Sequence, residues 1–151
     1  MPVDFVWRLL LAAGLGAAIG LEREYRRKPA GLRTNILIAI GSALFTILSL
    51  SMTDGTADHS RVAGQIVTGI GFLGGGAILR NRDTVHGMTT AATIWVNAAI
   101  GVAAGTGQYV IATVTTVLTM VVLVVLPPIE MYFERRAGWT DRHIPPDPGT
   151  Q

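Results

Sequence analysis

Apolar residues fill most of the chain in long runs, and short polar segments separate these runs. Crossing the hydrocarbon core of a bilayer, about 30 Å, takes roughly 20 residues of helix, with a usable range of about 17–25. Five runs approach this length: Phe5–Leu21, Arg33–Ser51, Val62–Leu79, Thr89–Ala104 with its flanks, and Tyr109–Leu126. The last is rich in Val and Thr, but in lipid a helix pairs every backbone polar group within its own segment. The pattern predicts an all-α integral membrane protein with five transmembrane helices.

The charges between the runs predict how the chain is threaded. Basic residues gather in the segment 22–28, around Arg80 and Arg82, and after the fifth run at Arg135 and Arg136, whereas the segments 52–60 and 105–108 contain no Lys or Arg. Because cytoplasmic loops carry an excess of Lys and Arg, we expect the amino terminus outside and the carboxyl terminus inside. A signal peptide has its charge before the apolar core. Here the basic cluster follows the core, which favours an uncleaved first span.

Two stretches of the chain share one pattern at a constant offset. Gly20–Thr34 and Gly76–Thr90 each begin with a glycine, continue through a basic loop and end in Gly-x-x-Thr. The first two spans therefore resemble the third and fourth in the same orientation, and the fifth stands apart. Parallel repeats of this kind occur in membrane transport proteins, with sites near the repeat interface. The alternative is that two glycine-bounded hairpins match by chance.

Composition agrees with a membrane protein and removes several other classes. The 151 residues are 50% hydrophobic and 15% charged, with a mean hydropathy of +0.46, whereas soluble domains carry about 25% charged residues. A net charge of +2 gives no indication of nucleic-acid binding. The absence of cysteine excludes disulfides and thiolate sites. Residues 1–136 form the predicted transmembrane domain, and the polar, Pro-rich residues 137–151 a disordered cytoplasmic tail.

No enzyme motif is present, so we expect no catalytic residue, no metal site and no cofactor. Lys28 is the only lysine and follows Arg27, which excludes a Walker A loop. No serine lies in a G-x-S-x-G elbow. The stretch Gly69–Gly76 does match the G-x-G-x-x-G of dinucleotide loops. Such a loop needs a preceding strand and an acid about 20 residues on, but the stretch continues an apolar run and position 94 is Ile94.

The glycines have a second interpretation, which is close helix packing. Small residues four apart let two helix backbones approach in lipid. The residues expected to pack in this way are Gly16, Gly20, Gly69, Gly71, Gly74, Gly75 and Gly76, and Gly101 and Gly105 share the spacing. A local break of the helix that turns carbonyls toward a cavity is the alternative. Packing is the interpretation we favour.

Three ordered motifs resemble the MgtC/SapB family of bacterial inner-membrane proteins. They are Gly20-Leu-Glu-Arg-Glu with Ala30-Gly-Leu-Arg-Thr34, then Asp58-His-Ser-Arg-Val-Ala-Gly-Gln65 leading into Gly69–Gly76, then Gly87-Met-Thr-Thr-Ala-Ala-Thr93-Ile-Trp95. The resemblance covers roughly residues 14–107. Two departures stand out: Thr89 replaces the Asn that many members carry, and the chain ends in a Pro-rich segment where several members have a soluble domain.

The resemblance implies a link to growth under magnesium limitation, acid stress and, in some pathogens, virulence. Members are often labelled magnesium transporters, but the best-described member acts as a regulator that restrains the rotary ATP synthase. The expected partners are therefore the lipid bilayer and other membrane proteins, with a homo-oligomer as a further option and no nucleic acid.

Polar residues near the spans are the candidate contact residues, because such groups are expensive in a membrane. At the inner side these are Glu22, Arg23, Arg33 and Asn35, with Glu22 expected to pair with Arg33 or Arg80. Ordinary interfacial anchoring is the alternative for this group. Asn97, in the middle of the fourth run, is expected either to join helices by hydrogen bonds or to belong to a site. Thr89 completes the group.

At the outer side, Asp58, Arg61 and Gln65 are the candidates for contact with a partner or an ion. Asp58 and Arg61 lie one helical turn apart and are expected to share a face, and Gln65 lies one turn further in than Arg61. Asp58 also suits the start of a helix as a cap, which is its alternative role.

Three classes of function remain. The first is a regulator that acts through contacts with other membrane complexes. The second is a transporter or weak conductor of magnesium or protons, which the parallel repeat supports. Magnesium prefers several oxygen ligands, however, and no acids converge at mid-membrane in the sequence. The third, an enzyme such as an ATPase, conflicts with the missing phosphate loop. We favour the first class.

Overall fold

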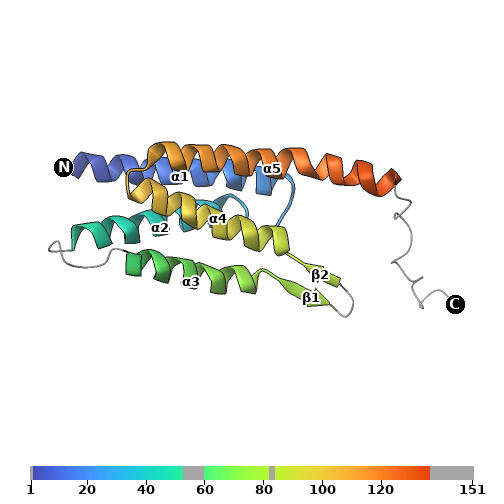
Figure 1. Cartoon of the computed structure of the whole chain (residues 1–151), viewed down its shortest axis with the longest axis horizontal. Helices are drawn as coiled ribbons and strands as arrows, with labels where there is room; N and C mark the ends of the chain where they lie inside the picture. The colour runs from blue at the N-terminus through green and yellow to red at the C-terminus, as the bar shows by residue number, and fades with distance from the viewer. Residues whose placement is uncertain (1, 53–59, 82–83, 137–151) are drawn as a thin grey trace. The chain divides into compact units, whose positions relative to one another are not determined.

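The computed structural model describes residues 2–52, 60–81 and 84–136. This part of the chain forms five helices and one short antiparallel hairpin (Figure 1). The elements are α1 Pro2–Tyr25, α2 Leu32–Ser51, α3 Ser60–Gly76, β1 Leu79–Asn81, β2 Thr84–His86, α4 Met88–Gly105 and α5 Tyr109–Arg136. Four of the helices, α1, α2, α4 and α5, have the length and apolar composition to cross a membrane. The five-span topology and its orientation stay predictions.

The chain divides into two compact units, Met1–Met120 and Val121–Gln151. In the first unit, α2 packs closely against α1 and α4, and α1 also contacts α4. Helix α3 packs mainly on α4 and touches α2 over a smaller contact. The buried core of α2 and α4 is built from small and branched residues such as Ala39, Ala43, Ile94 and Ala98. The described part of the second unit is the rest of α5.

Helix α1 continues beyond the predicted Leu21, so Gly20 lies inside the helix and does not end it. Glu22 and Arg26, one turn apart, form an ion pair that supports this extra turn. The helix ends at a left-handed Arg27 (φ 52°), and Lys28 N–H donates to the Arg23 carbonyl at 2.9 Å. This is the hydrogen-bond pattern of a Schellman motif.

Both Gly-x-x-Thr motifs open a helix, as the sequence predicts. Helix α2 begins after Gly31, and the Glu24 carboxylate accepts the Leu32 N–H at 3.1 Å. Helix α4 begins after Gly87, which has φ 91°. A Cβ at Gly87 would collide with the Ala77 carbonyl oxygen, so both the dihedral angle and the space require glycine there.

The third predicted run ends early. Helix α3 stops at Gly76, and Leu79, the predicted end of the span, begins strand β1. Consecutive glycines disfavour a helix, at about 1 kcal/mol each relative to Ala. Strand β2 then pairs with β1 in the register Leu79 to His86. A hairpin therefore replaces the last turn of the run and the loop that the sequence suggested.

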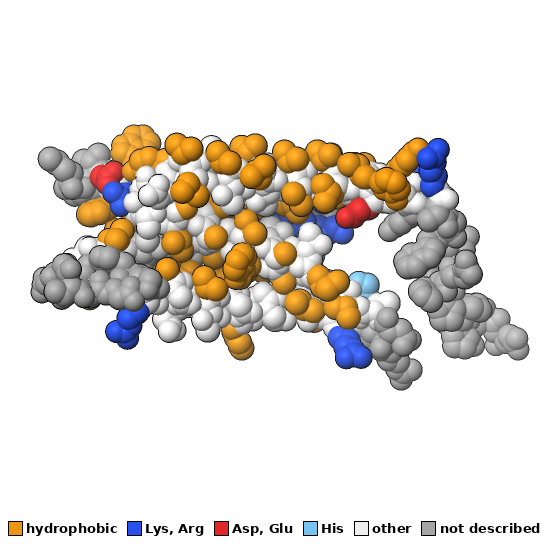
Figure 2. Space-filling model, viewed as in Figure 1, with side chains coloured by type: hydrophobic (Ala, Val, Ile, Leu, Met, Phe, Trp, Pro, Cys, Tyr) orange, Lys and Arg blue, Asp and Glu red, His pale blue; other side chains and the backbone are white. Residues whose placement is uncertain are grey.

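Helix α5 runs past the predicted Leu126 to Arg136 and contains Pro127 and Pro128. Proline normally interrupts a helix, but membrane helices tolerate it when other groups satisfy the freed backbone. Large apolar side chains are exposed across the helices, and Figure 2 shows them covering much of the visible surface. Trp7, Phe45, Phe72 and Leu118 are each at least 60% exposed. This surface is the one that a bilayer solvates.

Candidate functional site

A buried polar cluster lies where α1 ends and where α2 and α4 begin. Glu22 and Arg23 are only 8% and 4% exposed. The Glu22 carboxylate lies 2.7 Å from Arg26 Nε and 3.8 Å from Arg23 Nη1. Glu22 and Arg23 belong to the last turn of α1 and Arg26 follows directly after it, so one buried acid faces a buried cation and a half-buried one. Ion pairing offsets the cost of burying these charges.

Arg23 also joins α1 to α4. Its Nη2 donates a hydrogen bond of 3.1 Å to Thr90 Oγ1, in the first turn of α4, and both side chains are buried. The two residues are 67 positions apart in the chain. The bond therefore fixes the relative position of two helices that are not consecutive.

Asn35 and Asn97 make the matching connection between α2 and α4. Both are completely buried. Asn97 Nδ2 donates to the Asn35 backbone oxygen at 2.6 Å and to Asn35 Oδ1 at 3.2 Å. Asn35 Nδ2 in turn donates to the carbonyl oxygens of Ala30 and Gly31. The predicted interhelical role of Asn97 thus has a geometric basis, with Asn35 as its partner.

The pairing predicted for Glu22 is wrong in detail. Arg33 and Arg80 are exposed, and neither forms an ion pair with any residue that the structure describes. Arg33 is on the first turn of α2 and Arg80 on strand β1, whereas Arg26 is four positions from Glu22, in the turn that directly follows α1. Thr89 is exposed as well, and its carbonyl accepts the Thr93 hydroxyl within α4. The structure therefore gathers Glu22, Arg23, Asn35 and Asn97 but leaves Arg33 and Thr89 outside.

Several buried polar atoms in this cluster have no hydrogen-bond partner among the described residues. They are both carboxylate oxygens of Glu22, Nε of Arg23 and Oδ1 of Asn97. The close contact of Glu22 with Arg26 is therefore an ion pair without hydrogen-bond geometry. Buried polar atoms are normally hydrogen-bonded, so this end of the helix group has capacity for additional polar contacts.

A second polar group lies at the opposite end of α1: the sequence indicates that Arg8 must reach the membrane surface or find a partner, but it does not identify that partner. Arg8 Nη1 donates to the Gly105 carbonyl at 2.9 Å, and Arg8 also pairs with Asp4 one turn away. Tyr109 donates its hydroxyl proton to the same Asp4 carboxylate at 3.1 Å. The group ties the start of α1 to the end of α4 and the start of α5. The one signal in the sequence was an arginine inside an apolar run, which needs a partner.

Asp58 lies outside the described residues, and its predicted site stays a prediction. Helix α3 begins at Ser60, and Arg61 and Gln65 are exposed on it. If Asp58 contacts a partner, Asp58→Asn should abolish rescue of low-magnesium growth in a deletion strain, although Asn caps about as well as Asp. If Asp58 only caps the helix, Asp58→Asn is silent and Asp58→Ala costs about 0.5–2 kcal/mol of stability. Growth is scored against the amount of protein in the membrane, and full rescue by Asp58→Asn contradicts the contact role.

The glycines divide into two groups by what surrounds them. A Cβ at Gly16 would lie 2.8 Å from the Asn35 carbonyl oxygen, and one at Gly20 would lie 2.7 Å from Leu32 Cα. These two positions therefore form a close backbone contact between α1 and α2, and Gly101 and Gly105 form the equivalent contact between α4 and α2. Gly74 has ordinary contact with Ala91 of α4.

The contact predicted for Gly71 and Gly75 is not made within this chain. No atom of the described residues lies within 4 Å of a Cβ built at Gly69, Gly71, Gly75 or Gly76. Helix α3 turns Gly74 and Ile70 toward α4. Gly71 follows Ile70 by one position and Gly75 follows Gly74 by one position, which places both on another face of the helix.

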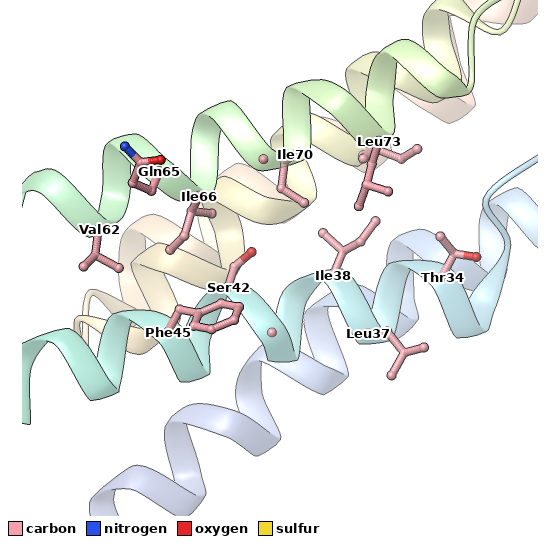
Figure 3. A pocket seen from close by; sticks show the side chains of 13 residues that line it. Thr34, Leu37, Ile38, Ser42, Phe45, Val62, Gln65, Ile66, Ile70 and Leu73 are labelled. Atoms are coloured by element: carbon pink, nitrogen blue, oxygen red, sulfur yellow. The ribbon is translucent and has the colours of Figure 1, made fainter.

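A groove separates α2 from α3. Its volume is about 720 Å³, and Ile94 of α4 also lines it. Figure 3 shows Ile38 and Ser42 of α2 and Ile66 of α3 turned toward the space between the two helices, with Thr34 near one end and Val62 near the other. Leu37 and Gln65 point away from the opposite helix in this view. Gln65 belongs to the wall that α3 provides, together with Ile66 and Gly69. Of the residues predicted from the sequence, Gln65 and Gly69 thus line this groove.

Comparison with known proteins gives a consistent result. The family model described as "MgtC family" matches residues 9–132. The chain is 48% identical to "Putative magnesium transporter YhiD" of Escherichia coli (strain K12) over 130 residues. The matched stretch covers 82% of this chain and 60% of that protein. It is 50% identical over 116 residues to "Protein MgtC" of Salmonella typhimurium (strain 14028s / SGSC 2262), 77% of this chain and 49% of that protein.

"Protein MgtC" of Brucella abortus (strain 2308) is 46% identical over 123 residues, or 82% of this chain and 51% of that protein. The chain thus spans between 49% and 60% of the length of these relatives. No solved structure matches the chain. With four helices that have the composition of membrane spans, the match shows a membrane protein.

Proposed function

Because this chain belongs to the MgtC family, we propose that it serves magnesium homeostasis in the bacterial inner membrane as a non-enzymatic regulator of other membrane complexes. The proposal includes adaptation to low magnesium, acid and the host environment. The rotary ATP synthase is the partner we propose from the family resemblance, and a homo-oligomer is compatible with it.

One observation supports the regulator over a transporter. The polar side chains inside the helix group hydrogen-bond to one another across helices, in the pairs Arg23–Thr90 and Asn97–Asn35. A transport path needs polar groups that line a passage and can give up their protein partners to bind the ion. Groups that fix three helices together instead give a rigid body with an apolar exterior. Such a body suits contact with other membrane proteins, for which close van der Waals packing supplies the affinity.

Transport of magnesium or protons is the second candidate, and a specific observation favours it. Both carboxylate oxygens of the buried Glu22 lack hydrogen bonds among the described residues, as does Asn97 Oδ1. A relative at 48% identity also carries the name of a magnesium transporter. Water or a proton at these atoms would create part of a polar route between α1, α2 and α4.

Flux through the purified protein separates the two candidates. Liposomes that contain only this protein are loaded with a magnesium indicator or a pH indicator, and the rates are compared with protein-free liposomes. We expect no saturable flux of either ion. In parallel, inverted membrane vesicles with the ATP synthase should show slower ATP-driven proton pumping after the protein is added. Saturable flux in wild type that is lost in Glu22→Gln would reject the regulatory function in favour of transport. Unchanged pumping would remove the ATP synthase as partner.

A further inference from the structure

The groove between α2 and α3 has the form of a ligand site. On α2 it is lined at positions 34, 37, 38, 41, 42 and 45, and on α3 at 62, 65, 66, 69, 70 and 73. This spacing keeps each set on one face of its helix over about three turns. The volume of about 720 Å³ lies in the range of small-molecule sites, about 300–1,000 Å³.

Glycines keep both walls of the groove open. Gly41 on α2 and Gly69 on α3 line it, and a Cβ at either position would meet no described atom within 4 Å. The remaining lining is mostly Leu, Ile, Val and Phe. Leu37 at the mouth is 68% exposed. The space is therefore apolar, long and narrow, which suits a hydrocarbon chain.

Exposed cations stand at the end of the groove where α2 begins. Arg33 precedes the lining residue Thr34 and lies one turn before Leu37, so Arg33 and Leu37 share a face at the mouth. Arg27 and Lys28 in the preceding turn are exposed too. None of these three cations forms an ion pair with a described residue. Glu24, at the end of α1, accepts the Leu32 N–H.

We propose that an anionic phospholipid occupies this groove, with an acyl chain between α2 and α3 and its phosphate at Arg33 and Lys28. Basic groups next to a membrane helix attract anionic headgroups. A helix of a partner protein is a poorer fit. Membrane helices carry their own Lys and Arg at the side of the basic loops, where they would meet Arg33. The site is independent of the proposed regulatory function.

Competition between two lipids tests the proposal. The purified, delipidated protein is incubated with equal amounts of phosphatidylglycerol and phosphatidylcholine of identical acyl chains, and the retained lipid is measured by native mass spectrometry. We expect wild type to prefer phosphatidylglycerol. Arg33→Gln should reduce that preference about fivefold, which corresponds to about 1 kcal/mol per cation near the surface. Gly69→Leu should fill the groove and remove retention of both lipids.

Each variant has a matched control outside the groove. Arg80→Gln removes an exposed cation on β1 that does not line the groove, and Gly71→Leu adds the same side chain to another open face of α3. Both controls should behave as wild type. If Gly69→Leu unfolds in a thermal melt, Gly41→Leu blocks the groove from α2. Equal retention by groove and control variants, or no change on Arg33→Gln, overturns the lipid site. So does a wild type that retains neither lipid but binds a hydrophobic helical peptide.

Discussion

Replacing Gly101 with alanine is expected to lower the free energy of unfolding by about 1–3 kcal/mol, the usual effect of overfilling a packed contact. A Cβ at this position would press on the Ala39 carbonyl oxygen and lie 2.8 Å from Ser42 Cβ. The carbonyl belongs to the backbone of α2, so relief requires α2 and α4 to separate. Gly101→Leu should prevent the folded state altogether. Denaturant unfolding of the protein in bicelles measures the difference.

Gly71→Ala is the matched control, and it should raise the free energy of unfolding instead of lowering it. No described atom lies within 4 Å of a Cβ there, and removing a helical glycine stabilises by up to about 1 kcal/mol in water. If both substitutions destabilise equally, α4 does not approach α2 as the structure has it. If Gly71→Ala alone destabilises, that face of α3 is occupied by a partner in the folded protein.

The glycine pattern shows what sequence can and cannot predict in this protein. Spacing alone identified Gly16, Gly20, Gly71 and Gly75 as equivalent candidates, yet only the first two lie against another helix within the described chain. A glycine has no side chain whose polarity marks the buried side of a helix. In lipid, apolar residues face outward as well as inward, so hydrophobic periodicity does not indicate the packed face either.

Apolar length predicted the helices well and their ends less well. The starts of α2 and α4 follow from Gly31 and Gly87, because glycine suits the turn before each helix. The end of α3 was placed at Leu79 since the run stays apolar beyond Gly76. Hydropathy does not distinguish an apolar strand such as β1 from one more helical turn. The resemblance to the MgtC/SapB family rested on ordered motifs and is confirmed.

The polar candidates were found from their depth in the membrane, but their partners were not. Glu22, Arg23, Asn35 and Asn97 do gather in space. The pairs Arg23–Thr90 and Asn97–Asn35 span 67 and 62 positions, and only the packing of α1, α2 and α4 decides them. A single sequence offers many cations for Glu22, and the closest pair forms with Arg26, four positions further along the chain.

The hydrogen bonds of Asn35 should make it the most sensitive polar residue of α2. Its side chain is completely buried, donates to two carbonyl groups of the preceding loop and accepts from Asn97. Asn35→Leu keeps the approximate volume but leaves these buried groups without their partner. The expected loss is about 1–3 kcal/mol, the effect of unsatisfied buried polar groups. Unfolding in bicelles is again the measurement.

Thr46→Val on the same helix is the control for this change. Thr46 is 7% exposed, and among the described residues its hydroxyl donates to the Ser42 carbonyl within α2. Because this bond joins no two helices, its loss should shift stability by less than about 1 kcal/mol, as for a typical hydrogen bond. A double-mutant cycle of Asn35→Leu with Asn97→Leu then isolates the bond between α2 and α4. Because one shared bond is lost in either single variant, the double variant should be less destabilised than the sum by at least about 0.5 kcal/mol. Strictly additive effects would mean that Asn97 does not donate to Asn35 Oδ1 in the folded protein, because Asn35→Leu keeps the backbone oxygen that accepts the other bond.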